Sequence, residues 1–227
     1  MRALVLADGL PPARADLDRV WPDWDRDVAL VIAADGGARL ADVLGMPIDL
    51  WVGDGDSLGE AGREDLRLRG VPMIDAAVDK DQTDTELALL AALDRGATRV
   101  TLIGALGGPR PDHALVNMLL LGHPRAMDAA VDILDPTARI RLLATTSEPG
   151  FAVRLDLAGR EGDLVSLVPL DDVVGVTTNG LRFPLTDATL QAGSSFTISN
   201  VRTNPAASVS IRAGRLLVLE VPATLAS

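Results

Sequence analysis

The sequence predicts an α/β domain built on a parallel sheet, followed by an antiparallel β-sandwich. In the first 135 residues, short β-branched segments alternate with longer segments of helical period. After Pro136 the helical period disappears, and short strand-like segments are separated by Gly, Pro, Asn and Asp. The 227 residues are 48% apolar, which is enough to bury a substantial core in one domain or two small ones. We therefore expect two domains, residues 1–136 and residues 137–227.

The strands of the first domain are short apolar segments rich in Val, Ile and Leu, bounded by turn residues. Such segments are typical of parallel strands that are buried on both faces. They predict a Rossmann-like parallel sheet with helices on both faces. The expected strands are Ala3–Ala7, Val28–Ala33, Ile48–Val52, Val71–Ile74, Arg99–Ile103 and Val131–Leu134.

Helices are expected between these strands, and a glycine follows the end of each. Glycine readily adopts the left-handed conformation that ends many helices. The helix that starts at Asp84 is the best marked, because Thr83 can cap its first turn and Glu86 is the capping-box partner. The expected helices are Ala38–Leu44, Gly62–Arg69, Asp84–Arg95 and Asp112–Leu121.

The second domain shows only strand-like segments, with turn residues at intervals that suit an antiparallel sandwich. The expected strands are Arg139–Leu143, Phe151–Leu155, Asp163–Val168, Val173–Thr177, Ser208–Ile211 and Leu216–Val221.

The net charge and the lack of cysteine exclude several classes of function. With 21 basic and 32 acidic side chains the formal charge is -11, so the chain should repel nucleic acids and anionic membranes. An anionic small molecule would need a divalent cation or a local basic group. The absence of cysteine excludes disulfides, thiolate metal sites and thiol nucleophiles. The start of the chain lacks the apolar run of a signal peptide, so we expect a soluble cytoplasmic protein.

Acidic and glycine-rich motifs follow four consecutive strands of the predicted sheet. Asp35-Gly36-Gly37 follows the second strand, Gly53–Ser57 the third, Asp79–Asp84 the fourth and Gly104–His113 the fifth. In open parallel sheets, ligands bind beyond the carboxyl ends of the strands, so all four motifs should share one edge. Carboxylates gathered there would repel one another unless a cation neutralised them. The sequence therefore predicts a magnesium-type site.

The motif Asp54-Gly55-Asp56 fits a hard cation. Alternate residues of an extended turn project similarly, and Gly55 places no side chain between the two carboxylates. Mg²⁺ is commonly held by one or two carboxylates together with substrate phosphates. Asp84 leaves two roles open, because at a helix start it can complement the helix dipole or contact the metal.

The segment Gly104–Gly108, followed by Arg110, is suited to phosphate. Its backbone N–H groups and a guanidinium fork can both bind phosphate oxygens. It is not a Walker loop, because the Lys-Ser/Thr ending is missing.

Taken together, these motifs resemble the thiamine pyrophosphokinase family. In the first half the resemblance rests on Ala34–Ala38, Gly53–Ser57, Lys80–Glu86, Gly104–Gly108, Asp112, His113 and Asn117. In the second half it rests on Asp163–Leu167, Thr177–Leu181, Ser199 and Asn200. The sequence departs from the family pattern at Pro109, which lies before Arg110, and at Phe183, where the family often has Trp.

The family implies a nucleotide-binding α/β domain, a β-sandwich, and a homodimer whose sites lie between subunits. It also implies Mg²⁺-dependent transfer of the pyrophosphoryl group of ATP to thiamine, which releases AMP. The expected catalytic residues are Asp35, Asp54, Asp56, Asp84 and Asp112, with Asp54, Asp56 and Asp84 as metal ligands. The expected ATP-binding residues are Gly36, Gly37, Ser57, Thr83, Gly107, Gly108, Arg110 and His113. The expected thiamine-binding residues are Asn117, Phe183, Ser199 and Asn200.

Three other functions remain open on the sequence. A related pyrophosphokinase could use a pterin alcohol as acceptor, with the same metal chemistry and a different pocket. A nucleotide-sugar transferase could use Asp-x-Asp, although Asp35 and Asp84 would then have no role. A nonenzymatic module could sense a nucleotide and release no AMP. For the acceptor, Thr177–Leu185 and Gln191–Asn200 offer hydrogen-bonding groups and aromatic faces, the ingredients of a small-molecule pocket.

Overall fold

The computed structural model describes residues 1–145 and 152–223. The chain divides into two compact units, Met1–Pro136 and Thr137–Ser227. None of the helices in the described part of the chain combines the length and the apolar content needed to cross a bilayer.

Met1–Pro136 contains a parallel sheet with the strand order β6-β5-β1-β2-β3-β4. The strands are β1 Arg2–Leu6, β2 Val28–Ala34, β3 Leu50–Gly53, β4 Met73–Asp75, β5 Arg99–Ile103 and β6 Ala130–Asp135. The chain starts in the middle of the sheet, proceeds outward to β4, and then returns to the other side of β1 to form β5 and β6. The switch point of the sheet therefore lies between β1 and β5.

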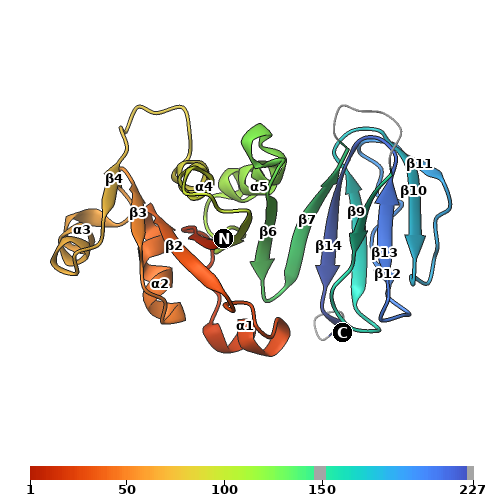
Figure 1. The fold of residues 1–227 in the computed structure, drawn as a ribbon, viewed down its shortest axis with the longest axis horizontal. Helices are drawn as coiled ribbons and strands as arrows, with labels where there is room; N and C mark the ends of the chain where they lie inside the picture. Colours follow the sequence, from red (N-terminus) through yellow and green to blue (C-terminus); the bar gives the residue numbers. More distant parts are fainter. Residues whose placement is uncertain (146–151, 224–227) are drawn as a thin grey trace. The chain divides into compact units, whose positions relative to one another are not determined.

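The helices cover both faces of this sheet because crossover connections between parallel strands are right-handed. The helices α1, α2 and α3 connect strands on the outward path, whereas α4 and α5 follow the return and lie on the opposite face (Figure 1). Helix α4 packs against β1, β2 and β3, and α2 packs against β1 and β2. The bounds are α1 Arg14–Val20, α2 Ala38–Leu44, α3 Gly59–Leu68, α4 Asp84–Asp94 and α5 Pro111–Leu119. Single 3-10 turns are η1 Asp35–Gly37, η2 Leu120–Gly122 and η3 Pro124–Ala126.

The core of this unit lies between the sheet and its helices. Leu4 and Leu6 of β1, Trp51 of β3 and Ile103 of β5 are fully buried in it. Because these strands are fixed by packing, the loops at their carboxyl ends start from a rigid edge.

Thr137–Ser227 forms two antiparallel layers, described over residues 137–145 and 152–223. One layer has the order β12-β9-β14-β7, and the other has the order β11-β10-β13-β8. Apolar side chains from both layers, among them Val165, Leu216, Val176 and Val209, form the core between them. The strands are β7 Ala138–Ala144, β8 Val153–Asp156, β9 Leu164–Pro169, β10 Val173–Asn179, β11 Ala188–Leu190, β12 Asn200–Val201, β13 Ser208–Ile211 and β14 Arg215–Val221.

The predicted fold class, a Rossmann-like parallel sheet followed by an antiparallel sandwich, is confirmed. The expected strand at Phe151–Leu155 corresponds to β8, although Phe151 itself lies outside the described residues. The helix expected at Asp112–Leu121 is shorter, because α5 ends at Leu119 and the 3-10 turn η2 follows it. The sequence interpretation missed α1, β11 and β12.

Candidate active site

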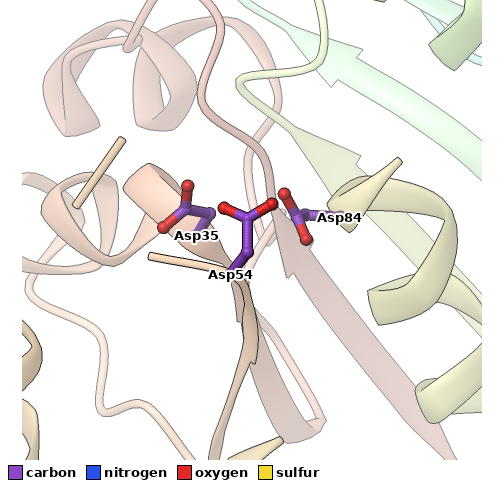
Figure 2. A group of neighbouring side chains, drawn as sticks. All are labelled: Asp35, Asp54 and Asp84. Carbon is purple, nitrogen blue, oxygen red and sulfur yellow. The ribbon is translucent and has the colours of Figure 1, made fainter. Parts of the chain in front are cut away.

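Three carboxylates from separate elements converge at the carboxyl ends of β2 and β3. Asp35 opens the turn η1 directly after β2, Asp54 follows β3, and Asp84 is the first residue of α4. One oxygen of each side chain lies within 4.8 Å of the others, and Figure 2 shows the three carboxylates close together. The residues are far apart in sequence, so the sheet and α4 together create this acidic group.

Asp35 is the most buried of the three, and the residue as a whole is only 3% exposed. Its backbone has a φ of 43°, a left-handed conformation that Asp tolerates better than most residues. The backbone N–H groups of Ser57 and Leu58 donate to its two oxygens at 3.0 and 3.3 Å. Burial raises the pKa of Asp35 to about 6, although these two amides oppose the change.

Lys80 stands between the other two carboxylates. Its Nζ lies 2.5 Å from Asp54 Oδ2 and 3.1 Å from Asp84 Oδ1. The hydrogen bond from Lys80 lowers the pKa of Asp54. Burial on its own would lower the pKa of Lys80, but the two carboxylates outweigh it and raise that pKa above its ordinary value. The Lys80 ammonium therefore supplies a positive charge among these carboxylates.

Asp84 occupies the start of α4 and faces the other carboxylates. Thr83 caps the helix as predicted, because its Oγ1 accepts a 3.2 Å hydrogen bond from the Glu86 N–H. Burial raises the pKa of Asp84, with the charge of Lys80 opposing the rise. Asp84 Oδ1 is buried, and its partner is the Lys80 ammonium at 3.1 Å. The Asp84 carboxylate lies close to those of Asp35 and Asp54, so it can serve as a ligand of a shared metal ion.

The expected ligand Asp56 lies beside this group and is exposed to solvent. The structure places it outside the set of three mutually close carboxylates found among the described residues. Its N–H donates to Asp54 Oδ1 at 3.1 Å, and its own Oδ1 accepts from Ser57 Oγ at 3.2 Å. Asp56 and Ser57 therefore belong to the loop that shapes the site.

Trp51 and Arg63, which the sequence interpretation did not single out, hold the backbone of the site through hydrogen bonds. The indole N–H of Trp51 donates to the Asp35 carbonyl. The Arg63 guanidinium lies 5.4 Å from the centre of the Trp51 ring and donates to the Asp54 carbonyl at 2.9 Å. These two side chains fix the backbone under two of the three carboxylates. Trp51 lies two residues before Gly53 in the sequence, and this position could have marked it as a residue near the site. Its hydrogen bond to Asp35 could not be predicted, because it depends on the fold.

The two glycines after Asp35 are required by close packing. A Cβ on Gly36 would lie 2.2 Å from a carboxylate oxygen of Asp8, and one on Gly37 would lie 2.0 Å from the Leu6 carbonyl. Arg39 donates to Asp8 Oδ1 at 3.2 Å and to the Ser57 carbonyl at 3.0 Å. The sequence interpretation did not identify Asp8 and Arg39 as site residues. Arg39 places a half-exposed positive charge at this edge of the sheet.

The loop after β5 is tied to the end of β1. The Gly9 N–H donates to the Gly104 carbonyl at 2.7 Å, and the Asn117 side chain donates to the Ala105 carbonyl at 2.9 Å. Asn117 is buried, so it holds the loop in place. Gly107 and Gly108 are exposed and have φ values of 67° and 81°.

Arg110 and Asp112 form a bidentate ion pair at the start of α5. Nε and Nη2 of Arg110 donate to the two carboxylate oxygens at 3.0 and 2.7 Å. This pairing lowers the pKa of Asp112 to about 2. His113, the next residue, is exposed at the first turn of α5.

The second unit brings Phe183, Ser199 and Asn200 together. Asn200 Oδ1 accepts from the Phe183 N–H at 3.0 Å, and its Nδ2 donates to the Phe183 carbonyl at 2.7 Å. The Phe183 ring is 65% exposed. Ser199 has a φ of 60° and is anchored by a 3.0 Å hydrogen bond from its N–H to Ser166 Oγ. Asn200 therefore fixes the backbone that presents an exposed aromatic ring.

Fold and site together define an α/β protein with a cation-attracting acidic centre at its strand ends and a separate β-sandwich. The family model described as "Thiamin pyrophosphokinase, catalytic domain" matches residues 23–133. The model described as "Thiamin pyrophosphokinase, vitamin B1 binding domain" matches residues 152–216. The chain belongs to the thiamine pyrophosphokinase family, whose members are enzymes.

Individual relatives agree with this assignment. A thiamine pyrophosphokinase of Bacillus subtilis is 27% identical over 186 residues, which are 81% of this chain and 83% of the relative. The solved structure of a thiamin pyrophosphokinase family protein from Enterococcus faecalis is 28% identical, with a TM-score of 0.78, and the match covers 97% of this chain and 99% of that one. The solved structure from Bacillus subtilis has a TM-score of 0.79 at 24% identity, covers 98% and 99% of the two chains, and shows the shared fold. The family expected from the motifs is confirmed.

Proposed function

We propose that this enzyme transfers the pyrophosphoryl group of ATP to the hydroxyl group of thiamine, with Mg²⁺ bound at the acidic centre. The products are thiamine diphosphate and AMP. The observation that carries the proposal is the convergence of Asp35, Asp54 and Asp84, with oxygens within 4.8 Å of one another, in a chain whose two halves match the two domains of this family.

The donor atoms suit Mg²⁺, which prefers hard carboxylate oxygens. Asp54 and Asp84 already share one cation, because the Lys80 ammonium contacts an oxygen of each. We assign Asp54, Asp56 and Asp84 to the metal and its waters. Asp35, whose oxygens already accept two backbone N–H groups, belongs to the same group or to the layer behind it. When bound, Mg²⁺ supplies neutralisation of the phosphate charge.

The chain positions the reactants for an in-line displacement. The thiamine hydroxyl oxygen forms a bond to the β-phosphorus, the bond from that phosphorus to the oxygen bridging it to the α-phosphate breaks, and AMP leaves with the electron pair. The hydroxyl proton is released to solvent or to a nearby carboxylate. Such transfers are accelerated mainly by positioning and by neutralisation of charge. Asp112 orients the nucleophile or the nucleotide in this proposal.

ATP is held by the loops at the strand ends. Backbone N–H groups in flexible glycine segments and a guanidinium are suitable donors for phosphate oxygens. For Arg110 to bind phosphate it must exchange the carboxylate of Asp112 for a phosphate oxygen. The proposed ATP-binding residues are Gly36, Gly37, Ser57, Thr83, Gly107, Gly108, Arg110 and His113.

Thiamine is cationic and binds in this proposal through acids and ring faces. The exposed Phe183 ring offers such a face, and Asn200 holds its backbone. We assign Asn117, Ser199 and Asn200 to the thiamine side together with Phe183. We further propose a cytoplasmic homodimer in which each site uses residues of both subunits.

A product assay tests the proposed function. The protein is incubated with ATP and Mg²⁺, with and without thiamine, and AMP and thiamine diphosphate are separated by chromatography. We expect both products in equal amounts, only when thiamine is present, and loss of both in Asp54→Asn. AMP formation with a pterin alcohol but not with thiamine would identify the related pyrophosphokinase. Nucleotide binding without AMP release would identify a sensor.

A further inference from the structure

Lys80 is the only lysine in the chain. The other positively charged side chains are arginines, apart from two histidines. An ammonium group is a compact point charge on a flexible stem, whereas a guanidinium is a planar fork that binds carboxylates in pairs. The one lysine side chain therefore lies between two carboxylates of the acidic centre. A compact ammonium fits between two carboxylates in this position better than a planar guanidinium does.

The contacts of Lys80 are those that a metal ion would make. Its Nζ lies 2.5 Å from Asp54 Oδ2 and 3.1 Å from Asp84 Oδ1, and its side chain is only 13% exposed. Mg²⁺ binds carboxylate oxygens at about 2.0–2.1 Å. An ammonium and a Mg²⁺ ion on the same two oxygens would overlap or repel strongly at that distance. The two cations therefore compete for the same oxygens.

Lys80 has space to move away from the carboxylates. It lines a cavity of about 450 Å³ that also contacts Ile74, Gln82 and Leu87. The residue lies between β4 and α4, outside both elements, so a new side-chain rotamer disturbs no backbone hydrogen bond of a helix or strand. The ammonium can leave the acidic centre while its aliphatic stem stays against the apolar wall of the cavity.

We propose that Lys80 is a built-in counter-cation, which holds Asp54 and Asp84 together in the metal-free enzyme and gives up their oxygens when Mg²⁺ binds. The inference rests on the proposed function, because it takes these carboxylates as the Mg²⁺ site. Without a cation, the buried carboxylates would repel one another and open the site. With Lys80, the centre keeps its arrangement and the affinity for Mg²⁺ is lowered to the extent that the ammonium occupies the oxygens.

The single lysine makes a direct test possible. An amine-selective reagent labels two groups in this chain, the Lys80 ε-amino group and the α-amino group of Met1, and peptide mass spectrometry measures each. We expect slow labelling of Lys80 in EDTA and a several-fold faster rate at saturating Mg²⁺, with the α-amino group unchanged as the internal control. An equal or slower Lys80 rate with bound Mg²⁺ overturns the inference.

The variant Lys80→Met tests the competition by affinity. Removing the competitor should tighten Mg²⁺ binding about five- to ten-fold, since the apparent dissociation constant is the intrinsic one divided by the free fraction of the site. The same variant should have a lower melting temperature in EDTA and a larger increase on addition of Mg²⁺. Arg125→Met is the matched control, because Arg125 lines the same cavity and pairs with Asp94 away from the acidic centre.

Two measurements separate this inference from the proposed function. Mg²⁺ binding to the wild-type enzyme is followed by intrinsic tryptophan fluorescence and by thermal shift, without substrates. If Mg²⁺ binds and Lys80→Met has unchanged or weaker affinity, the inference fails and the proposed metal site remains. If the wild type binds no Mg²⁺, both fail. The labelling experiment uses the wild-type chain, so it decides the question whether or not the variant folds.

Discussion

The indole N–H of Trp51 donates a 3.0 Å hydrogen bond to the main-chain carbonyl of Asp35. Trp51 is fully buried in β3, so a core side chain of one strand fixes the first residue after its neighbour β2. This bond leaves the Asp35 backbone little freedom, and it extends the rigidity of the sheet to the carboxylate.

Trp51→Phe should therefore reduce both stability and metal binding. Loss of the indole removes one of the two hydrogen bonds to the Asp35 carbonyl, which also accepts from the Ala38 N–H, and costs about 0.5–1.5 kcal/mol of unfolding free energy. Urea unfolding measures that loss, and Mg²⁺ titration measures the weakened site. Trp24→Phe is the control, because Trp24 is also buried, bonded through its indole to Asp18 and covered by Arg14. Equal Mg²⁺ affinity in the two variants would assign Trp51 to the core alone.

Asp56→Asn should reduce Mg²⁺-dependent turnover severely and leave the fold intact. The variant removes one negative charge from the loop that carries Asp54, and because Asp56 is exposed the substitution creates no cavity in the core. Circular dichroism checks the fold and the product assay checks turnover. Glu60→Gln, an exposed neutralisation on the following helix, is the control. Near-normal turnover of Asp56→Asn would remove this residue from the ligand set.

The first turn of α4 allows stability and activity to be separated. Thr83→Ala should cost about 1 kcal/mol through loss of the cap to the Glu86 N–H. Asp84→Ala removes an acid that is close to Asp54, so its effect on stability should be small and its effect on turnover large. Thermal unfolding and turnover are measured for both. If the loss of activity is proportional to the loss of stability in both variants, Asp84 acts only at the end of the helix and not in the metal site.

Arg110 and Asp112 give a prediction for pH. Because the pairing lowers the pKa of Asp112 to about 2, below the ordinary value of 3.8, the pair is complete above the ordinary value. Its contribution to stability is then lost as the pH falls through about 2. Titration of Asp112 by NMR should give this value in the wild type and a value nearer 3.8 in Arg110→Gln. An unchanged titration in the variant would contradict the ion pair.

The proposed shared site can be tested by mixing two inactive variants. Asp56→Asn alters the acidic centre, and Asn200→Ala releases the Phe183 backbone in the other unit. After subunit exchange, a heterodimer carries one intact site if each site uses both subunits. We expect recovery of up to about a quarter to a half of wild-type activity. Demonstrated exchange without recovery would place both residues in the site of one subunit.

The sequence predicted the main elements of the sheet and the convergence of its acids. Asp35 follows β2, Asp54 follows β3, and Asp84 comes after β4 at the start of α4. The carboxyl ends of parallel strands lie at one edge of a sheet, so the sequence order of the motifs was enough to predict that these acids lie close together. Helix α1 was missed because it buries only Leu17 and its N-cap, Ala13, offers no side-chain cap. Its seven residues carry neither a clear apolar stripe nor a start signal.

Contacts between distant side chains were beyond sequence reasoning. The pairing of Arg39 with Asp8 depends on how α2 packs against β1, and the hydrogen bond from Trp51 to Asp35 depends on how β2 and β3 are aligned. Lys80 was part of a recognised motif, but its position between two carboxylates depends on the path of the chain from β4 to α4. Periodicity predicts elements, and tertiary packing decides which atoms meet.

The separate origin of the three carboxylates has a consequence for folding. Asp35, Asp54 and Asp84 come from η1, the end of β3 and the start of α4, so no single element or adjacent pair in sequence contains the centre. A collapsed intermediate with formed helices and loose packing would bind Mg²⁺ no better than scattered surface acids. Metal affinity thus reports the completion of native packing in this unit. Followed in a stopped-flow refolding experiment, it should appear in the last kinetic phase, after the helical signal is complete.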